Sequence, residues 1–146
     1  MGELELRRQV CFALHTAARA TTMLYRPILA RLGLTYPQYL VLLVLWERDG
    51  RTVSDLGEQL HLDSGTLSPL LKRLEAAGVV SRARAVHDER IVEVHLTDEG
   101  WALRERAADV PSIVARASGL HRSELAELHR TRVTLTDSLT GAAAAG

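Results

Sequence analysis

The sequence predicts a mainly α-helical fold with a small β-hairpin in its second half. Apolar residues recur at three- and four-residue steps along most of the 146 residues, which is the period of an amphipathic helix. Between residues 79 and 96 the period changes to two, as expected for paired strands. Two short helical segments stand directly before this hairpin, separated only by His61-Leu62-Asp63, and such a pair forms a helix-turn-helix.

Length and composition fit one domain, since domains cluster near ~100–150 residues. A hydrophobic fraction of 47% supports a packed core, and a formal net charge of zero argues against a generally basic protein, although a local basic patch is enough to bind DNA. The longest apolar run, residues 39–46, is far shorter than the ~20 residues of a membrane span. The acidic N-terminus lacks the pattern of a signal peptide. We therefore expect a cytoplasmic protein without membrane contact.

The first third of the chain predicts two helices. The first covers residues 4–31 and ends at Gly33. Pro27 lacks a backbone N–H and its ring clashes with the helix one turn back, so we expect a kink or break near residues 23–26. The second runs from Thr35 to about Glu47, with Pro37 in its first turn. It is apolar around much of its circumference, which places it deep in the fold.

The helix-turn-helix follows between residues 52 and 78. Thr52 is expected to cap a short helix, and Asp63 or Ser64 the next one. The second helix is expected to end at Gly78 and to bury four leucines: Leu67, Leu70, Leu71 and Leu74.

A hairpin directly after a helix-turn-helix is a wing. Its predicted strands are residues 79–82 and 91–96, with a charged tip at 84–90. Residues 97–99 then cap a helix to about Ser118, which Pro111 could bend, and a last helix spans 123–139 before a tail at 141–146 that should fray. The fold class is thus a winged helix-turn-helix within a single domain, 1–146.

We assign residues 35–97 to the DNA-binding region and the helices of 4–34 and 98–140 to dimerisation. Because the winged region is too small to bury the apolar faces of these outer helices, we expect a second subunit to cover them. A two-fold dimer would bind a pseudo-palindromic DNA site with half-sites about 10 bp apart or a multiple of that spacing.

Candidate DNA-binding residues lie on the non-leucine face of the second helix and in the wing. Hydroxyls and N–H groups at a helix start suit phosphate or base-edge contacts, and an apolar side chain can touch a thymine methyl. On the wing, Arg90 is sized for a narrow minor groove, with Asp88 or Glu89 holding it in place. The alternative is that these charges only solvate a surface, an alternative we also keep for Arg82. The candidates are Ser64, Thr66, Ser68, Pro69, Lys72, Arg73, Asp88 and Arg90.

With these elements in order, the chain resembles the MarR (multiple-antibiotic-resistance regulator) family of repressors over about residues 6–139. Four strings resemble one subfamily, the organic hydroperoxide resistance regulators, in which a cysteine reacts with peroxide and two tyrosines hydrogen-bond its thiolate. The resemblance assigns these roles to Cys11, Tyr25 and Tyr36, and it implies a repressor that leaves its operator DNA on oxidation. The strings are Gln9-Val-Cys-Phe-Ala-Leu14, Leu24-Tyr-Arg-Pro27, Leu34-Thr-Tyr-Pro-Gln-Tyr39 and Leu62-Asp-Ser-Gly-Thr-Leu-Ser-Pro69.

Taken without the resemblance, a lone cysteine on an amphipathic helix is more often an inert small hydrophobe. Cys11 stands 14 residues before Tyr25, about 21 Å along an unbroken helix, so the two would meet only where helices of two subunits cross. Because the chain has no second cysteine, an oxidised Cys11 would need a low-molecular-weight thiol, or another protein, as its disulfide partner. His15, at i+4, either assists the thiolate or is a surface histidine.

Three other hypotheses remain at this point. A repressor induced by a small phenolic ligand, with Cys11 structural, differs from the redox hypothesis in that thiol alkylation should not affect its induction. A cysteine enzyme using Cys11 and His15 would need an oxyanion site or a resolving thiol, and neither is recognisable. Metal sensing is disfavoured because the six histidines are scattered. We expect no cofactor and no metal.

Overall fold

In the computed structural model, which describes residues 2–146, the first long helix is α1 (Val10–Ala30). A 3-10 turn, η1 (Leu6–Arg8), precedes it, so the helix begins later than expected. Of the kink or break predicted before Pro27, the break was wrong, because α1 continues through this residue to its end, and the kink stays a prediction. A proline in the last turns of a helix removes only one hydrogen bond, and the burial of Leu29 holds this end of α1 against the rest of the fold.

The chain turns sharply between α1 and α2 (Tyr36–Glu47). Gly33 has a φ of +69°, and the N–H of Leu34 donates to the carbonyl of Leu29 at 3.2 Å, an arrangement that ends many helices. Thr35 then caps α2 through a reciprocal pair of hydrogen bonds with Gln38. As predicted, α2 is a core helix, with four buried side chains: Tyr39, Val41, Leu42 and Leu45.

Helices α3 (Val53–Leu60) and α4 (Ser64–Ala76) form the predicted helix-turn-helix. Thr52 caps α3 and Asp63 caps α4, each accepting a hydrogen bond from the N–H three residues later. The turn between them passes through His61 at a φ of 54°. All four predicted leucines of α4 are buried, which confirms the expected inward face.

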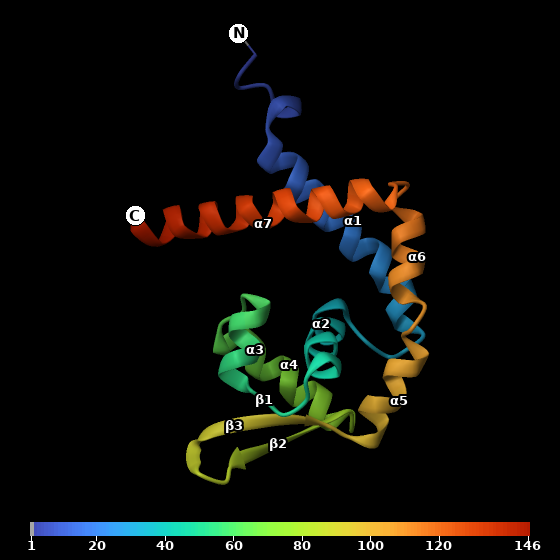
Figure 1. Ribbon diagram of the computed structural model, residues 1–146, viewed down its shortest axis with the longest axis vertical. Helices are drawn as coiled ribbons and strands as arrows, with labels where there is room; N and C mark the ends of the chain where they lie inside the picture. Colours follow the sequence, from blue (N-terminus) through green and yellow to red (C-terminus); the bar gives the residue numbers. More distant parts are fainter. Residues whose placement is uncertain (1) are drawn as a thin grey trace. The chain divides into compact units, whose positions relative to one another are not determined.

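The sheet has three antiparallel strands in the order β1-β3-β2. They are β1 (Arg51–Thr52), β2 (Val80–Ala85) and β3 (Asp88–Leu96), and Figure 1 shows β2 and β3 as a long ribbon beyond the helix-turn-helix. The predicted tip at residues 84–90 was too wide, since only Val86 and His87 form the turn. Asp88 and Arg90 therefore belong to β3. Polar residues fill this part of the ribbon because it lies outside the core, so no apolar alternation marks it in the sequence.

The expected single helix from residue 98 to 118 is in fact two, α5 (Asp98–Arg106) and α6 (Val110–Ala117). Pro111 lies in the first turn of α6, where its missing N–H does no harm, so it starts a helix and does not bend one. The last helix, α7 (Arg122–Ala145), includes most of the tail that was expected to fray. Its alanines have the highest helix propensity of all residues, which accounts for the difference.

The chain divides into two compact units, one extending through Ala108 and one covering Asp109–Gly146. The first contains α1 to α5 and the sheet, and the second contains α6 and α7. The assignment of residues 4–34 and 98–140 to dimerisation stays a prediction. Across residues 2–146, no helix has the length and apolar character required to cross a bilayer.

Candidate functional site

The outer face of α4 carries every DNA-contact candidate predicted on this helix. All six side chains are exposed, while the leucines between them point inward. At the start of the helix, Asp63 accepts a hydrogen bond from the N–H of Thr66 at 2.7 Å, and this bond lowers the pKa of the Asp63 carboxyl. The face thus presents hydroxyls, an apolar ring and two cations: Ser64, Thr66, Ser68, Pro69, Lys72 and Arg73.

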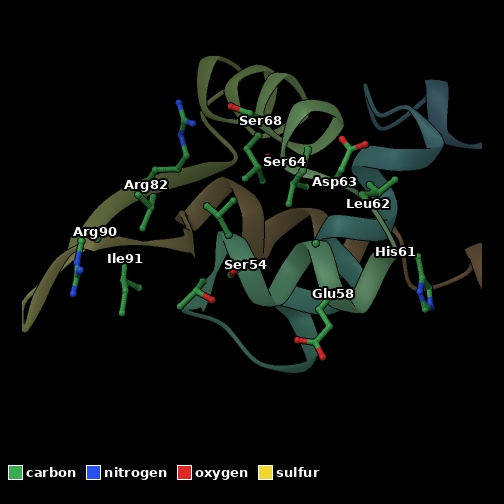
Figure 2. A pocket seen from close by; sticks show the side chains of 16 residues that line it. Ser54, Glu58, His61, Leu62, Asp63, Ser64, Ser68, Arg82, Arg90 and Ile91 are labelled. Carbon is green, nitrogen blue, oxygen red and sulfur yellow. The ribbon is translucent and has the colours of Figure 1, made fainter. Parts of the chain in front are cut away.

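A hollow of about 1040 Å³ lies between the helix-turn-helix and the wing. Figure 2 shows its walls, with Ser54 on α3, Ser64 and Ser68 on α4, and Arg90 on β3. It is open to solvent and joins the outer face of α4 to the wing. Neither Ser54 nor the hollow could be predicted from the sequence, because only the packing of the hairpin against α3 and α4 creates the hollow.

The wing holds Arg90 in a defined position. The Asp88 carboxylate accepts hydrogen bonds from the main-chain N–H of Arg90 at 3.0 Å and from its guanidinium at 3.2 and 3.3 Å. These bonds lower the pKa of Asp88. Asp88 is therefore the partner of Arg90, whereas Glu89 offers its main-chain carbonyl to the guanidinium of Arg84.

Arg82 has a structural partner. Its guanidinium donates to the Glu75 carboxylate at 3.0 Å, and its main-chain N–H donates to the same carboxylate at 3.1 Å. The hydrogen bond from the Arg82 side chain is the main cause of the lowered pKa of Glu75. This double contact ties β2 to the last turns of α4 and so links that helix to the wing.

Tyr25 and Tyr36 come together although they lie on different helices. Their rings stack with centroids 4.5 Å apart, and the ring of Tyr39 lies 5.8 Å from that of Tyr25. Burial, followed by the neighbouring tyrosines, raises the pKa of Tyr25 to about 12, and burial also raises the pKa of Tyr36. Both therefore remain neutral hydrogen-bond donors at neutral pH. Tyr39 was not predicted as part of this cluster, although its i+3 spacing from Tyr36 on a helix indicated a shared face.

Cys11 is exposed and is the second residue of α1. The first turn of a helix favours negative charge, so the position suits an anionic sulfur. Because α1 is uninterrupted, Cys11 and Tyr25 of one chain are separated by about 21 Å of helix, at 1.5 Å per residue. The single chain thus brings the two tyrosines together but not the cysteine. His15 is exposed one turn after Cys11.

Comparison with known proteins decides the family. The profile described as transcriptional regulator SarA/Rot matches residues 23–106, more than half of the chain. The organic hydroperoxide resistance transcriptional regulator of Bacillus subtilis (strain 168) is 44% identical over 136 residues, which cover 93% of this chain and 92% of the relative. The chain belongs to the MarR family of transcriptional regulators, in its organic hydroperoxide resistance subfamily. The resemblance inferred from the motifs is therefore confirmed.

Two further relatives agree with this assignment. The HTH-type transcriptional regulator TtmR of Methylorubrum extorquens (strain PA1) is 48% identical over 134 residues, covering 92% of this chain and 69% of TtmR. Among solved structures, reduced AbfR bound to DNA has a TM-score of 0.79 and 36% identity, with 93% of each chain covered. AbfR has also been solved overoxidized and bound to DNA, and with a disulfide formed.

As a MarR-family member the protein is a DNA-binding winged-helix transcriptional regulator, and its relatives are regulators, not enzymes. The predicted fold class is confirmed, with the helix-turn-helix and wing at the expected places.

Proposed function

We propose that this regulator is a cytoplasmic repressor that senses organic hydroperoxides through Cys11 and then releases its operator. The observation that carries the proposal is the stacked pair of Tyr25 and Tyr36, which brings two tyrosine rings together in a chain whose one cysteine is exposed on the same helix as Tyr25. The name of the Bacillus subtilis relative supplies the class of oxidant.

A homodimer completes the sensor. The first turns of α1 expose apolar side chains such as Val10, which is 65% exposed, and α7 exposes Leu128, Val133 and Leu139. Exposed apolar side chains gathered on one part of a protein can mark an interaction surface. If a second copy covers them, the α1 helices of the two subunits can cross, and Cys11 of one subunit can then lie beside the tyrosine pair of the other.

The chemistry needs a thiolate, an organic hydroperoxide and a second thiol. The Cys11 sulfur attacks the terminal peroxide oxygen, so that an S–O bond forms, the O–O bond breaks, and the leaving alkoxide takes a proton to become an alcohol. The sulfur is oxidised to sulfenic acid and the peroxide is reduced. A low-molecular-weight thiol then attacks the Cys11 sulfur, forming a mixed disulfide and releasing water. The partner must come from outside the chain because Cys11 is its one cysteine.

Operator DNA would lie against α4 and the wing. The exposed face from Ser64 to Arg73 suits the major groove, where hydroxyls and N–H groups at a helix start meet phosphates and Lys72 and Arg73 add charge. Arg90, held by Asp88, would enter the adjacent minor groove. The double-stranded site would then be read by two such units per dimer.

The decisive experiment compares Cys11→Ser with the wild type. Serine keeps the size and a hydrogen-bonding oxygen but cannot be oxidised, so the variant should fold, dimerise and bind the operator. Cumene hydroperoxide with free cysteine should release operator from the wild type only, and intact mass should show the added thiol. If the serine variant also releases DNA under peroxide, Cys11 is not the sensor and induction by a small phenolic ligand takes its place.

A further inference from the structure

An uninterrupted series of aromatic rings runs from the tyrosine pair to the last turn of α2. Tyr36 stacks on Tyr25, Tyr25 lies 5.8 Å from Tyr39, and Tyr39 meets Trp46 edge to face at 6.3 Å between centroids. Edge-to-face and offset contacts at these distances are favourable and directional. A displacement of the tyrosine pair would therefore shift the ring of Trp46, ten residues farther along α2 than Tyr36.

Trp46 in turn holds the start of α5. Its indole Nε1 donates to the carbonyl of Gly100 at 2.9 Å, across 54 residues of sequence. Close by in the chain, Asp49 accepts a hydrogen bond from the N–H of Leu96 at 2.8 Å. The end of α2 is thus fastened both to α5 and to the end of β3.

The same turn of α5 holds the end of the recognition helix α4. The hydroxyl of Thr97 contacts the carbonyls of Gly78 and Val79 at 2.6 and 3.0 Å, and its N–H donates to Val79 at 3.1 Å. A Cβ on Gly100 would stand only 2.4 Å from the Val79 carbonyl oxygen, so the two backbones are in direct contact. Gly78 and Val79 follow Ala77, the residue that caps the end of α4. Trp46 is therefore linked to this segment through a single residue, Gly100.

We propose that Trp46 is a positioning residue that transmits the state of the tyrosine pair, through Gly100 and Val79, to the recognition helix. All of these contacts lie within the unit that extends through Ala108. The inference rests on the proposed function, since it supplies the route by which oxidation at the sensor changes DNA binding. It adds a residue that touches neither the sensor cysteine of its own chain nor the DNA-contacting face of α4.

The test uses Trp46→Phe, which keeps an aromatic ring but removes the indole N–H, and Trp101→Phe as the matched control. Trp101 is the next residue after Gly100 but is 40% exposed and makes no ring contact with the tyrosines described above. Operator Kd is measured for reduced protein and after cumene hydroperoxide with free cysteine, and intact mass follows Cys11 modification. In Trp46→Phe we expect Cys11 to be modified at the wild-type rate and the reduced protein to bind operator. The ratio of the operator Kd after oxidation to the Kd of the reduced protein should fall at least about tenfold. Trp101→Phe should keep the wild-type ratio.

An unchanged ratio in Trp46→Phe overturns the inference, and so does loss of operator binding by its reduced form, since Trp46 would then only maintain the fold. A second measurement applies even if that variant does not fold. In Trp101→Phe, Trp46 is the one remaining tryptophan, and its fluorescence should change when the mixed disulfide forms without DNA. Constant emission overturns the inference. If instead the wild type keeps its operator after Cys11 is modified, the proposed function itself fails.

Discussion

The Asp88 carboxylate binds both the main chain and the side chain of Arg90, two residues farther along β3. The Arg90 side chain is nevertheless 91% exposed, so it is oriented without being buried. An oriented side chain loses less conformational entropy when it meets a partner than a free one does. The wing therefore presents its arginine to DNA in a prepared position.

Arg90→Ala should weaken operator affinity by roughly 1–3 kcal/mol while leaving the melting temperature unchanged, because the side chain makes no contact with the core. Arg90→Lys, which retains the charge but not the two-point hold on Asp88, should fall between the alanine variant and the wild type. Binding isotherms at fixed salt measure both. Wild-type affinity in the alanine variant would mean that the wing does not enter the DNA.

A charge on the apolar face of α1 or α7 should separate the proposed dimer. Val10→Glu and Leu128→Glu place a carboxylate where a second copy would bury an apolar side chain, at a cost of several kcal/mol per subunit unless the dimer dissociates. Sedimentation should show monomer at micromolar concentrations and much weaker operator binding. Val86→Glu is the control, because Val86 is fully exposed on the wing turn and should leave the dimer intact. Dimers in all three variants would contradict the proposed interface.

The caps and the buried leucines could be predicted because they depend on neighbours in sequence. Thr52 and Asp63 bond to the N–H three residues later, whatever the rest of the fold does. The strand β1, by contrast, is two residues long and exists only because β3 lies beside it, so no periodicity could reveal it. The outer part of the wing likewise has no recognisable sequence pattern, since exposed strands need no apolar alternation.

In the candidate site, too, the local features could be predicted from the sequence and the contacts between distant segments could not. The exposed face of α4 followed from spacing alone, and so did an acidic partner for Arg90, although the choice between Asp88 and Glu89 did not. The roles of Cys11, Tyr25 and Tyr36 came from family resemblance. Periodicity could not show that Tyr25 and Tyr36 stack, because they lie on two helices joined by a turn at Gly33. The link from Trp46 to Gly100 spans 54 residues and has no sequence signal.

Tyr25→Phe should slow the oxidation of Cys11 by about tenfold or more, because a hydrogen bond to a charged group contributes roughly 1.5–3 kcal/mol and phenylalanine removes the donor. Ring stacking on Tyr36 is preserved, so reduced operator binding should stay within about twofold of wild type. Stopped-flow or intact-mass time courses with cumene hydroperoxide give the rate. An unaltered rate would leave Tyr25 as a packing residue only.

Alkaline pH should destabilise the fold through the same tyrosine. Burial raises the pKa of Tyr25 to about 12 from the ordinary 10.0, so the folded state holds this proton more tightly than the unfolded chain does. Its contribution is fully present below pH 10 and is lost as the pH rises through 12. Tyr25→Phe should therefore lose less stability than the wild type between pH 10 and 12, as circular dichroism melting curves can show. Parallel curves for the two proteins would contradict the buried environment of the Tyr25 hydroxyl.

Adding one methyl group at Gly100 should destabilise the protein, although it lies in a helix where alanine is intrinsically the better residue. Alanine gains up to about 1 kcal/mol over glycine in a helix, but here its Cβ would stand 2.4 Å from the carbonyl oxygen of Val79 and 3.0 Å from a methyl of Leu96. The first neighbour is backbone and cannot rotate away, so α5 must move off the end of α4. Overpacking of this kind costs ~1–3 kcal/mol.

Gly141→Ala provides the matched control, since Gly141 is also helical and a Cβ there meets nothing within 4 Å. It should be neutral or stabilising by up to about 1 kcal/mol. Urea unfolding of both variants measures the difference. Because the added Cβ would push the start of α5 away from Val79, which lies just after α4, Gly100→Ala should weaken operator binding even where it is fully folded, and Gly141→Ala should not. Equal stability and equal operator affinity in the two variants would show that α5 does not press on the end of the recognition helix.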